Sequence, residues 1–574
     1  MTAQEQWSAL LTQFFVFDPK SPFIFTSTLF WIFFAGVLLA DGFLHRRTLA
    51  RNFFLFAVSL FFYYKTTGLF FLLLVYTAAW DYLMAILIHR ARSATMRMAW
   101  LIASVVMNLG VLFYFKYAYF FTDAYNAVAG THYPVFNWLA HWSNGFFGTH
   151  FTVSKIILPI GISFFTFQSI SYTVEVYRGK LRPLTRFTDY AFFVSFFPQL
   201  VAGPIVRASD FIPQINKPYE LTRQMLGMGV FWILNGLLKK IILSDYLAVQ
   251  LIDRVFDNPA VYSGFENLLA IFGYSLQVYA DFSGYTDIAI GVALLLGFHL
   301  NANFNSPYKA TDVSDFWRRW HISLSTWLRD YVYIPLGGNR KGSIVSYLLL
   351  GFFVALVAVL SRSWLVLAIA AGCMAVLMVA GLWIAPFRSW LNTNLNLMLT
   401  MLLGGFWHGA SWNFIIWGGL NGLGLVMYKA WKHISPWRDT SKWYFRAWSI
   451  LLTFSFISFT RVWFRSGSSS GWNEMEKTHD ISSEFSSALV MLDRIFLGMD
   501  LRVVPRVMAA YWPVVLVFLA GMIIHWLPEA WKQRYRAWFA GLPYGAMAFI
   551  AFVAVVLVYQ VLSAGTQPFI YFQF

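Results

Sequence analysis

The chain has 574 residues, of which 59% are hydrophobic and 20% aromatic, whereas only 12% are charged. This composition excludes an ordinary soluble globular domain, in which about 25% of residues are charged. The net charge of +16 does not indicate nucleic-acid binding, because the basic residues concentrate in short loops beside apolar runs. Apolar runs of about 17–25 residues recur along the chain, and runs of this length can cross a ~30 Å hydrocarbon core as helices. The composition therefore predicts an all-α polytopic membrane protein.

Four apolar spans are predicted in the first part of the chain, at about 23–43, 52–64, 68–88 and 98–121. The loops at 45–51 and 89–97 are basic, whereas 122–152 holds no lysine or arginine. Basic loops of membrane proteins stay in the cytoplasm. This alternation predicts that the N-terminal segment 1–22 lies outside the cytoplasm and that one membrane domain occupies 23–574.

The middle of the chain, from 188 to 343, does not read as a series of plain spans. A fifth span at about 156–177 precedes this segment. Within 188–343 the apolar pieces are short and are interrupted by prolines, glycines and acids such as Asp281 and Asp287. Broken backbone at membrane depth is tolerated only where protein or a water-filled cavity covers it. We therefore expect re-entrant or broken helices around a central funnel.

The last part of the chain returns to regular apolar runs, which predicts roughly 11–13 transmembrane helices in all. The segment 465–508 carries a balanced set of acidic and basic residues and is expected to form an extracytoplasmic loop. The predicted helices of this part lie at 345–361, 364–386, 395–407, 413–428, 447–464, 511–528 and 543–563.

His408 is the first candidate for chemistry. It follows an apolar run directly and lies among glycines. Ionisable groups at membrane depth are costly and usually functional, and histidine can exchange a proton near neutral pH. The apolar helix 395–407 has 13 residues, a length of about 20 Å that falls short of the bilayer core, so His408 is expected to lie recessed at the floor of a cavity. The alternative is packing alone, since Gly405 and Gly409 fit the small-xxx-small pattern.

His321 is the second candidate. Aromatic and apolar residues recur at spacings of three and four from Trp317 to Tyr331, which predicts one amphipathic helix at the cytoplasmic interface with His321 on its buried face. Asp312 or Ser314 could cap the start of this helix. A histidine in an aromatic stripe can also serve packing alone.

Several stretches of the chain resemble the membrane-bound O-acyltransferase family. The resemblance is strongest to the bacterial branch that O-acetylates alginate and weaker to proteins that transfer D-alanine to teichoic acids. It extends from about residue 20 to the end of the chain. The stretches that carry it are 158–168 (LPIGISFFTFQ), 197–205 (FPQLVAGPI), 281–285 (DFSGY), 316–324 (FWRRWHISL), 333–339 (YIPLGGN), 405–409 (GFWHG) and 569–574 (FIYFQF).

The resemblance implies that His408 is the catalytic histidine and His321 a second active-site histidine. It implies transfer of an acyl group, most commonly acetyl, from a cytoplasmic thioester such as acetyl-CoA to a hydroxyl of an extracytoplasmic polysaccharide. No bound cofactor or metal is implied, whereas a location in the bacterial cytoplasmic membrane and a partner of the SGNH hydrolase type are. Residues of the same motifs are expected to support the histidines or to bind substrate: Gln199, Asp281, Ser283, Asp287, Asn305, Trp317, Arg318 and Trp407.

The chain departs from this branch at 345–388, where two extra helices are predicted. An even number of crossings leaves the membrane side of His408 unchanged. Three other functions remain compatible with the residues. D-alanine could be the transferred group, a transporter could use the broken helices and intramembrane acids to move a sugar without chemistry, or His321 and His408 could be axial ligands of a haem.

Overall fold

In the computed structural model all regular secondary structure is helical within the described residues, which are 11–18, 23–149, 151–201, 203–361, part of 362–382, 383–435, 442–469, 481–562 and 570. This confirms the predicted class. Within those residues, four stretches are long and apolar enough to cross a membrane, and six if each sharply bent pair of helices forms one span. The larger number of crossings expected from the sequence stays a prediction, since several apolar helices are too short or too polar to meet this criterion.

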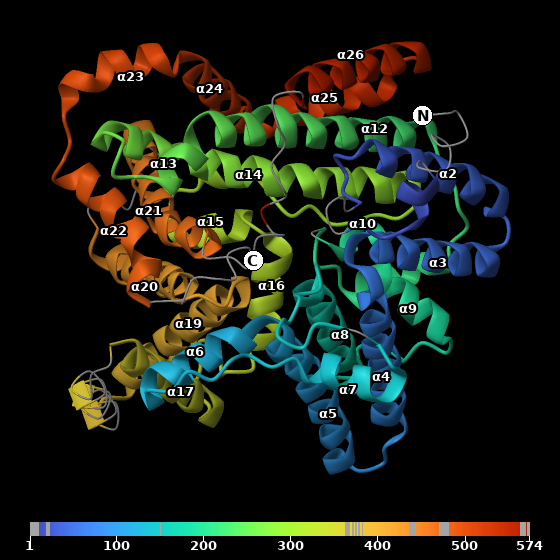
Figure 1. Ribbon diagram of the computed structural model, residues 1–574, viewed down its shortest axis with the longest axis horizontal. Helices are drawn as coiled ribbons and strands as arrows, with labels where there is room; N and C mark the ends of the chain where they lie inside the picture. The colour runs from blue at the N-terminus through green and yellow to red at the C-terminus, as the bar shows by residue number, and fades with distance from the viewer. Residues whose placement is uncertain are drawn as a thin grey trace.

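The N-terminal part forms the right and lower regions of Figure 1, where α4, α5 and α8 gather. The helix that begins with α5 continues into α6 through η2, a π-helical turn that carries Lys116. The helices of this part are α2 Thr28–Leu44, α3 Thr48–Thr67, η1 Gly68–Phe70, α4 Phe71–Arg90, α5 Ala94–Leu112, η2 Phe113–Tyr117, α6 Ala118–Ala129, α7 Trp138–Phe147, α8 Ile162–Tyr177, α9 Phe187–Ser195, α10 Phe197–Leu200 and α11 Ala208–Ile215.

Helix α14 (Gly264–Leu295) is the central element, and every residue from 273 to 289 is buried. It lies beside α12 (Arg223–Leu237), as Figure 1 shows. The two helices approach closely because glycines face each other: a Cβ on Gly236 would lie 2.4 Å from the carbonyl oxygen of Gly284. Small residues at such contacts allow helix backbones to meet in membranes. The helix is thus surrounded by protein, which explains why its sequence shows no polar face.

Beyond α12 the chain breaks repeatedly, as expected for the middle segment. The π-helical η3 carries Lys239 and Lys240, and the π-helical η6 carries Asp330. The elements of this part that follow α12 are η3 Leu238–Asp245, η4 Ala248–Ile252, α13 Asp253–Asp257, α14, η5 Pro307–Lys309, α15 Val313–Arg319, α16 Ile322–Leu328 and η6 Arg329–Tyr333.

The prediction of one continuous amphipathic helix over 317–331 is wrong in one respect. The structure divides it at His321 into α15 and α16, because His321 adopts the left-handed backbone conformation, with φ at +43°. Asp312 caps α15 by accepting a hydrogen bond from the Asp315 backbone N–H at 2.7 Å, which confirms one of the two expected caps. His321 therefore lies buried between the two short helices and not on the face of one continuous helix.

The C-terminal part occupies the left and top of Figure 1. Helix α19 has 24 residues, or about 36 Å, so the prediction of a 13-residue helix over 395–407 is wrong. A helix of the observed length is long enough to cross the bilayer core and gives no reason to place His408 at the floor of a cavity. The first inserted helix appears as α17, the second falls mostly outside the described residues, and α22 lies within the segment expected as a loop. The helices are α17 Ile344–Ser361, α19 Ala385–His408, α20 Trp412–Ile434, α21 Trp443–Ser469, α22 Ile481–Phe496, η7 Leu501–Val503, α23 Val504–Ala510, α24 Trp512–Trp526, α25 Glu529–Gly541 and α26 Tyr544–Leu562.

Candidate active site

His408 is the last residue of α19, where the chain turns toward α20. The turn is tight because glycines admit the neighbouring helix: a Cβ on Gly405 would lie 2.3 Å from the carbonyl oxygen of Phe414, and one on Gly409 would lie 2.1 Å from the Phe414 ring. Both glycines therefore serve close packing, as the alternative interpretation proposed, but the same packing also fixes the position of the histidine.

The imidazole of His408 is only 4% exposed and is surrounded by aromatic rings. The ring centroids of Trp407, Trp417 and Phe464 lie 4.9, 5.1 and 5.2 Å from that of His408. An apolar enclosure of this kind excludes water and strengthens every electrostatic interaction inside it. A proton exchanged here would pass to a bound group instead of to bulk solvent.

The π-helical turn η2 holds the end of α19 from the side. The ammonium group of Lys116 donates hydrogen bonds to the carbonyl oxygens of Trp407 at 2.7 Å and His408 at 2.9 Å. The hydroxyl of Tyr117 donates to the carbonyl oxygen of Phe406 at 2.7 Å. The last carbonyls of a helix have no partner within the helix, and a cation is favourable there. Lys116 and Tyr117 thus fix the backbone that carries His408.

His321 is completely buried, and its ring is oriented by Asn303. The amide oxygen of Asn303 accepts from the backbone N–H of Ser323 at 3.1 Å and lies 3.2 Å from Nδ1 of His321. A backbone N–H can only donate, so the amide oxygen faces this group, and we assign the proton of the neutral ring to Nδ1. Nε2 then keeps the lone pair, as a proton acceptor requires. The left-handed backbone of His321 is the kind of local strain found at functional sites.

Trp407 brings the two histidines into one site. Its indole ring contacts the imidazole of His408 at 4.9 Å and that of His321 at 6.3 Å between centroids. It also stacks on Phe167, which in turn stacks on Trp327 at 3.7 Å. This aromatic stack joins α8, α16 and α19, so the structure places both sequence-predicted histidines and Trp407 together.

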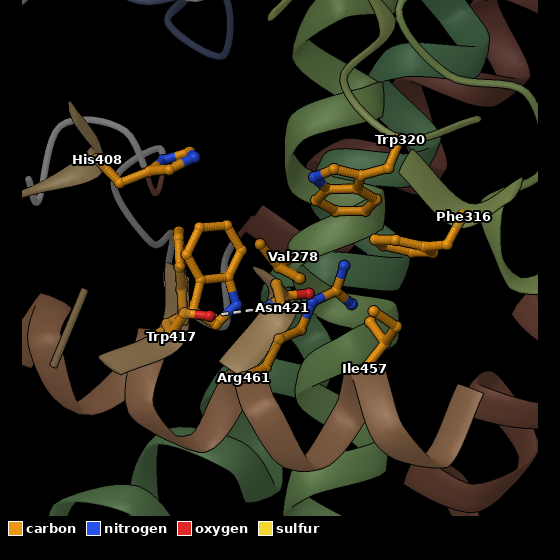
Figure 2. A pocket seen from close by; sticks show the side chains of 9 residues that line it. Val278, Phe316, Trp320, His408, Trp417, Asn421, Ile457 and Arg461 are labelled. Atoms are coloured by element: carbon orange, nitrogen blue, oxygen red, sulfur yellow. Dashed lines mark hydrogen bonds between the residues drawn. The ribbon is translucent and has the colours of Figure 1, made fainter. Parts of the chain in front are cut away.

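A narrow pocket opens beside His408, with room for about one water molecule. Figure 2 shows His408 and Trp417 on one side of it and Arg461 and Trp320 on the other. Asn421 lies between them and donates a hydrogen bond to the carbonyl oxygen of Trp417 at 2.9 Å. The central funnel expected from the sequence stays a prediction.

Two of the predicted supporting acids lie on α14 and are paired with lysines of η3. Asp281 lies 2.6 Å from the ammonium group of Lys240, which also pairs with Asp245 at 2.8 Å. Asp281 accepts a further hydrogen bond from the backbone N–H of Ile570 at 2.8 Å. Asp287 pairs with Lys239 at 2.6 Å. Both acids therefore link α14 to η3 through ion pairs.

The other predicted supporting residues divide into buried and exposed groups. Gln199 is buried and donates to the carbonyl oxygen of Phe193 at 2.6 Å, while Ser283 is buried on α14. The indole of Trp317 packs against Trp417 at 5.7 Å, close to the pocket. By contrast, Arg318 and Asn305 are exposed, and Asn303 occupies the buried position beside His321 instead.

Sequence reasoning missed Lys116, Asn303 and Arg461. The signal for Lys116 and Arg461 was present, because each is a charged residue inside an apolar run and such residues are usually functional in membrane proteins. Asn303 carried no such signal, since its role depends on a contact across the break at His321. Among the described residues, no group of three histidine, cysteine or acidic side chains is arranged to hold a metal ion.

Comparisons with known proteins agree with this arrangement. The family model "MBOAT, membrane-bound O-acyltransferase family" matches residues 180–360. The chain is 35% identical over 439 residues to a peptidoglycan O-acetyltransferase of Helicobacter pylori, covering 71% of this chain and 69% of the relative. It is 36% identical over 411 residues to a probable alginate O-acetylase AlgI of Pseudomonas putida, covering 71% of each.

A more distant relative is a teichoic acid D-alanyltransferase of Bacillus subtilis, 28% identical over 317 residues, which covers 54% of this chain and 69% of the relative. A polytopic helical membrane protein with two buried histidines around one tryptophan is the class that the fold and site define. The chain belongs to the membrane-bound O-acyltransferase family, and it is an O-acyltransferase.

Proposed function

We propose that this enzyme transfers an acetyl group from a cytoplasmic thioester, acetyl-CoA or a similar donor, to a hydroxyl of an extracytoplasmic polysaccharide, with His408 as the general base. The observation that carries the proposal is the joint burial of His408 and His321 around Trp407, with His408 on the pocket. The polymers named for the relatives, alginate and peptidoglycan, are both polysaccharides. An SGNH-type partner would receive the acetyl group or deliver it.

The chemistry begins when the oxygen of the acceptor hydroxyl attacks the carbonyl carbon of the thioester. An imidazole nitrogen of His408 takes the hydroxyl proton as the new C–O bond forms. The C–S bond then breaks, and the leaving thiolate takes the proton back from the imidazolium. General base catalysis of this kind typically contributes ~10²–10⁴ in rate. His321, held by Asn303, is the second active-site histidine.

The positive charge on the pocket wall favours acetyl over D-alanine as the transferred group. Arg461 is buried on the pocket wall, and its positive charge would repel the ammonium group of D-alanine. D-alanyl transfer, the activity named for the more distant relative, is therefore the second candidate.

Ester analysis of cell polymers tests the proposal. We expect polysaccharides from cells that lack the protein, or that express His408→Ala, to lose ester-linked acetate. Wild-type protein and the variant His299→Ala, which changes an exposed histidine, should restore it. Unchanged acetate with well-expressed His408→Ala would refute the role of His408. Loss of ester-linked D-alanine would identify the second candidate, and loss of the exported polymer itself would indicate a transporter.

A further inference from the structure

Arg461 of α21 is a buried cation on the wall of the His408 pocket. Its side chain is only 4% exposed. The guanidinium carbon lies 4.3 Å from the ring centroid of Trp320 and 5.7 Å from that of Phe316. Cation–π contacts of this type hold a guanidinium in place and leave its edge free to donate hydrogen bonds.

The hydrogen bonds of Arg461 leave most of its donors unused. Nη1 donates to the carbonyl oxygen of Ser275 at 3.2 Å and to the hydroxyl of Tyr308. Within the described part of the chain, Nε and Nη2 make no hydrogen bond, and no carboxylate lies within ion-pair distance of Arg461. By contrast, Arg465, one turn further along the same helix, pairs with Asp253 at 3.0 Å.

A buried charge without a counter-ion costs several kcal/mol. Its presence at this site is explained if an anionic group occupies the pocket during the reaction. The pocket has room for about one water molecule. A single negatively charged oxygen fits. The pocket also contains His408, where such an oxygen would form.

We propose that Arg461 is a catalytic residue that stabilises the oxyanion formed during acyl transfer, an inference that rests on the proposed function. When the acceptor oxygen attacks the thioester carbonyl, the π electron pair of the C=O bond moves to the carbonyl oxygen, and His408 takes the proton. Arg461 donates N–H bonds to this oxygen and stays charged throughout. The electron pair then returns, the C–S bond breaks, and the thiolate takes the proton from His408.

Kinetics of three variants test this role. Arg461→Met keeps an unbranched side chain of similar reach without donors, Arg461→Lys keeps the charge, and Arg465→Met is the matched control on the same helix. Each is purified in nanodiscs and assayed with acetyl-CoA and the polysaccharide that ester analysis identifies as the acceptor. Loss of an oxyanion donor typically costs about 10²–10³ in kcat. We expect this loss in Arg461→Met, a partial loss in Arg461→Lys, and a kcat close to wild type in Arg465→Met.

The Michaelis constant and chemical rescue separate catalysis from a structural role. The KM for acetyl-CoA should not change in Arg461→Met, because the oxyanion exists only after attack. Guanidinium chloride at millimolar concentration should restore part of the kcat of Arg461→Ala without raising its melting temperature. A wild-type kcat in Arg461→Met, or an effect on KM alone, would overturn the inference. An inactive wild-type enzyme would overturn the proposed function and this inference together.

Discussion

The ammonium group of Lys116 donates a hydrogen bond to the backbone carbonyl oxygen of His408 at 2.9 Å, although the two residues are 292 positions apart in the chain. The contact joins the N-terminal helices to the candidate base. A second bond from the same group, to Trp407, fixes the direction of the last helical turn. The position of the imidazole thus depends on a helix that carries none of the family motifs near Lys116.

Replacement of Lys116 should therefore lower the rate of transfer. Lys116→Met removes this donor from two buried carbonyl groups, and an unsatisfied buried acceptor typically costs about 1–3 kcal/mol. A displacement of about 1 Å at the reacting group can cost 10²-fold in rate, so we expect a loss of kcat of that order. Lys116→Arg should retain more activity because it keeps the donors. Acyl transfer by the purified variants checks this, with the exposed Lys217→Met as control.

Replacement of Asn303 should lower the rate of transfer, because its amide oxygen orients the ring of His321. Asn303→Leu removes the acceptor that holds Nδ1–H, and we expect transfer to fall by about 10-fold or more, a smaller loss than the ~10²–10⁴ that general acid–base catalysis itself contributes. Asn303→Asp keeps an acceptor in this place and should retain more activity. The exposed Asn301→Ala provides the comparison. Equal rates for Asn303→Leu and wild type would show that the orientation of His321 is irrelevant to the reaction.

Two neighbouring glycines should respond differently to alanine. A Cβ on Gly405 would lie 2.3 Å from a backbone oxygen, whereas one on Gly404 would meet only a terminal carbon of Leu328, at 3.2 Å. Overpacking typically costs about 1–3 kcal/mol, so Gly405→Ala should lower the melting temperature of the purified protein clearly. Gly404→Ala should have little effect. Equal melting temperatures would contradict the close approach of α19 and α20.

Lys240 should be more important for stability than either of its two acidic partners. Asp281→Asn leaves Lys240 paired with Asp245, so one positive and one negative charge remain together. Lys240→Met leaves two buried carboxylates without this cation, and breaking a buried pair typically costs about 3–5 kcal/mol. We expect a much lower melting temperature for Lys240→Met than for Asp281→Asn. The reverse order would show that the pairing with Asp281 dominates.

Much of the fold and the candidate site could be predicted from the sequence, because apolar length and isolated charges are strong signals in lipid. The all-helical class, the broken middle segment and the two histidines followed from such signals. The break at His321 could not be predicted, since the aromatic spacing continues through it and only tertiary contacts with Asn303 favour a left-handed residue there. The full length of α19 was missed because asparagines between Arg388 and Met398 lower its hydropathy without interrupting the helix.

The π-helical turn η2 (Phe113–Tyr117) restricts which deletions this enzyme can tolerate during evolution. A π-helical turn holds one residue more than an α-helical turn and usually arises at functional sites. Deleting that residue would rotate α5 and α6 relative to each other by about 100°. Lys116 and His408 would then lose register even if both residues were retained. Relatives with a regular helix here need a different group to cap the helix that ends at their histidine.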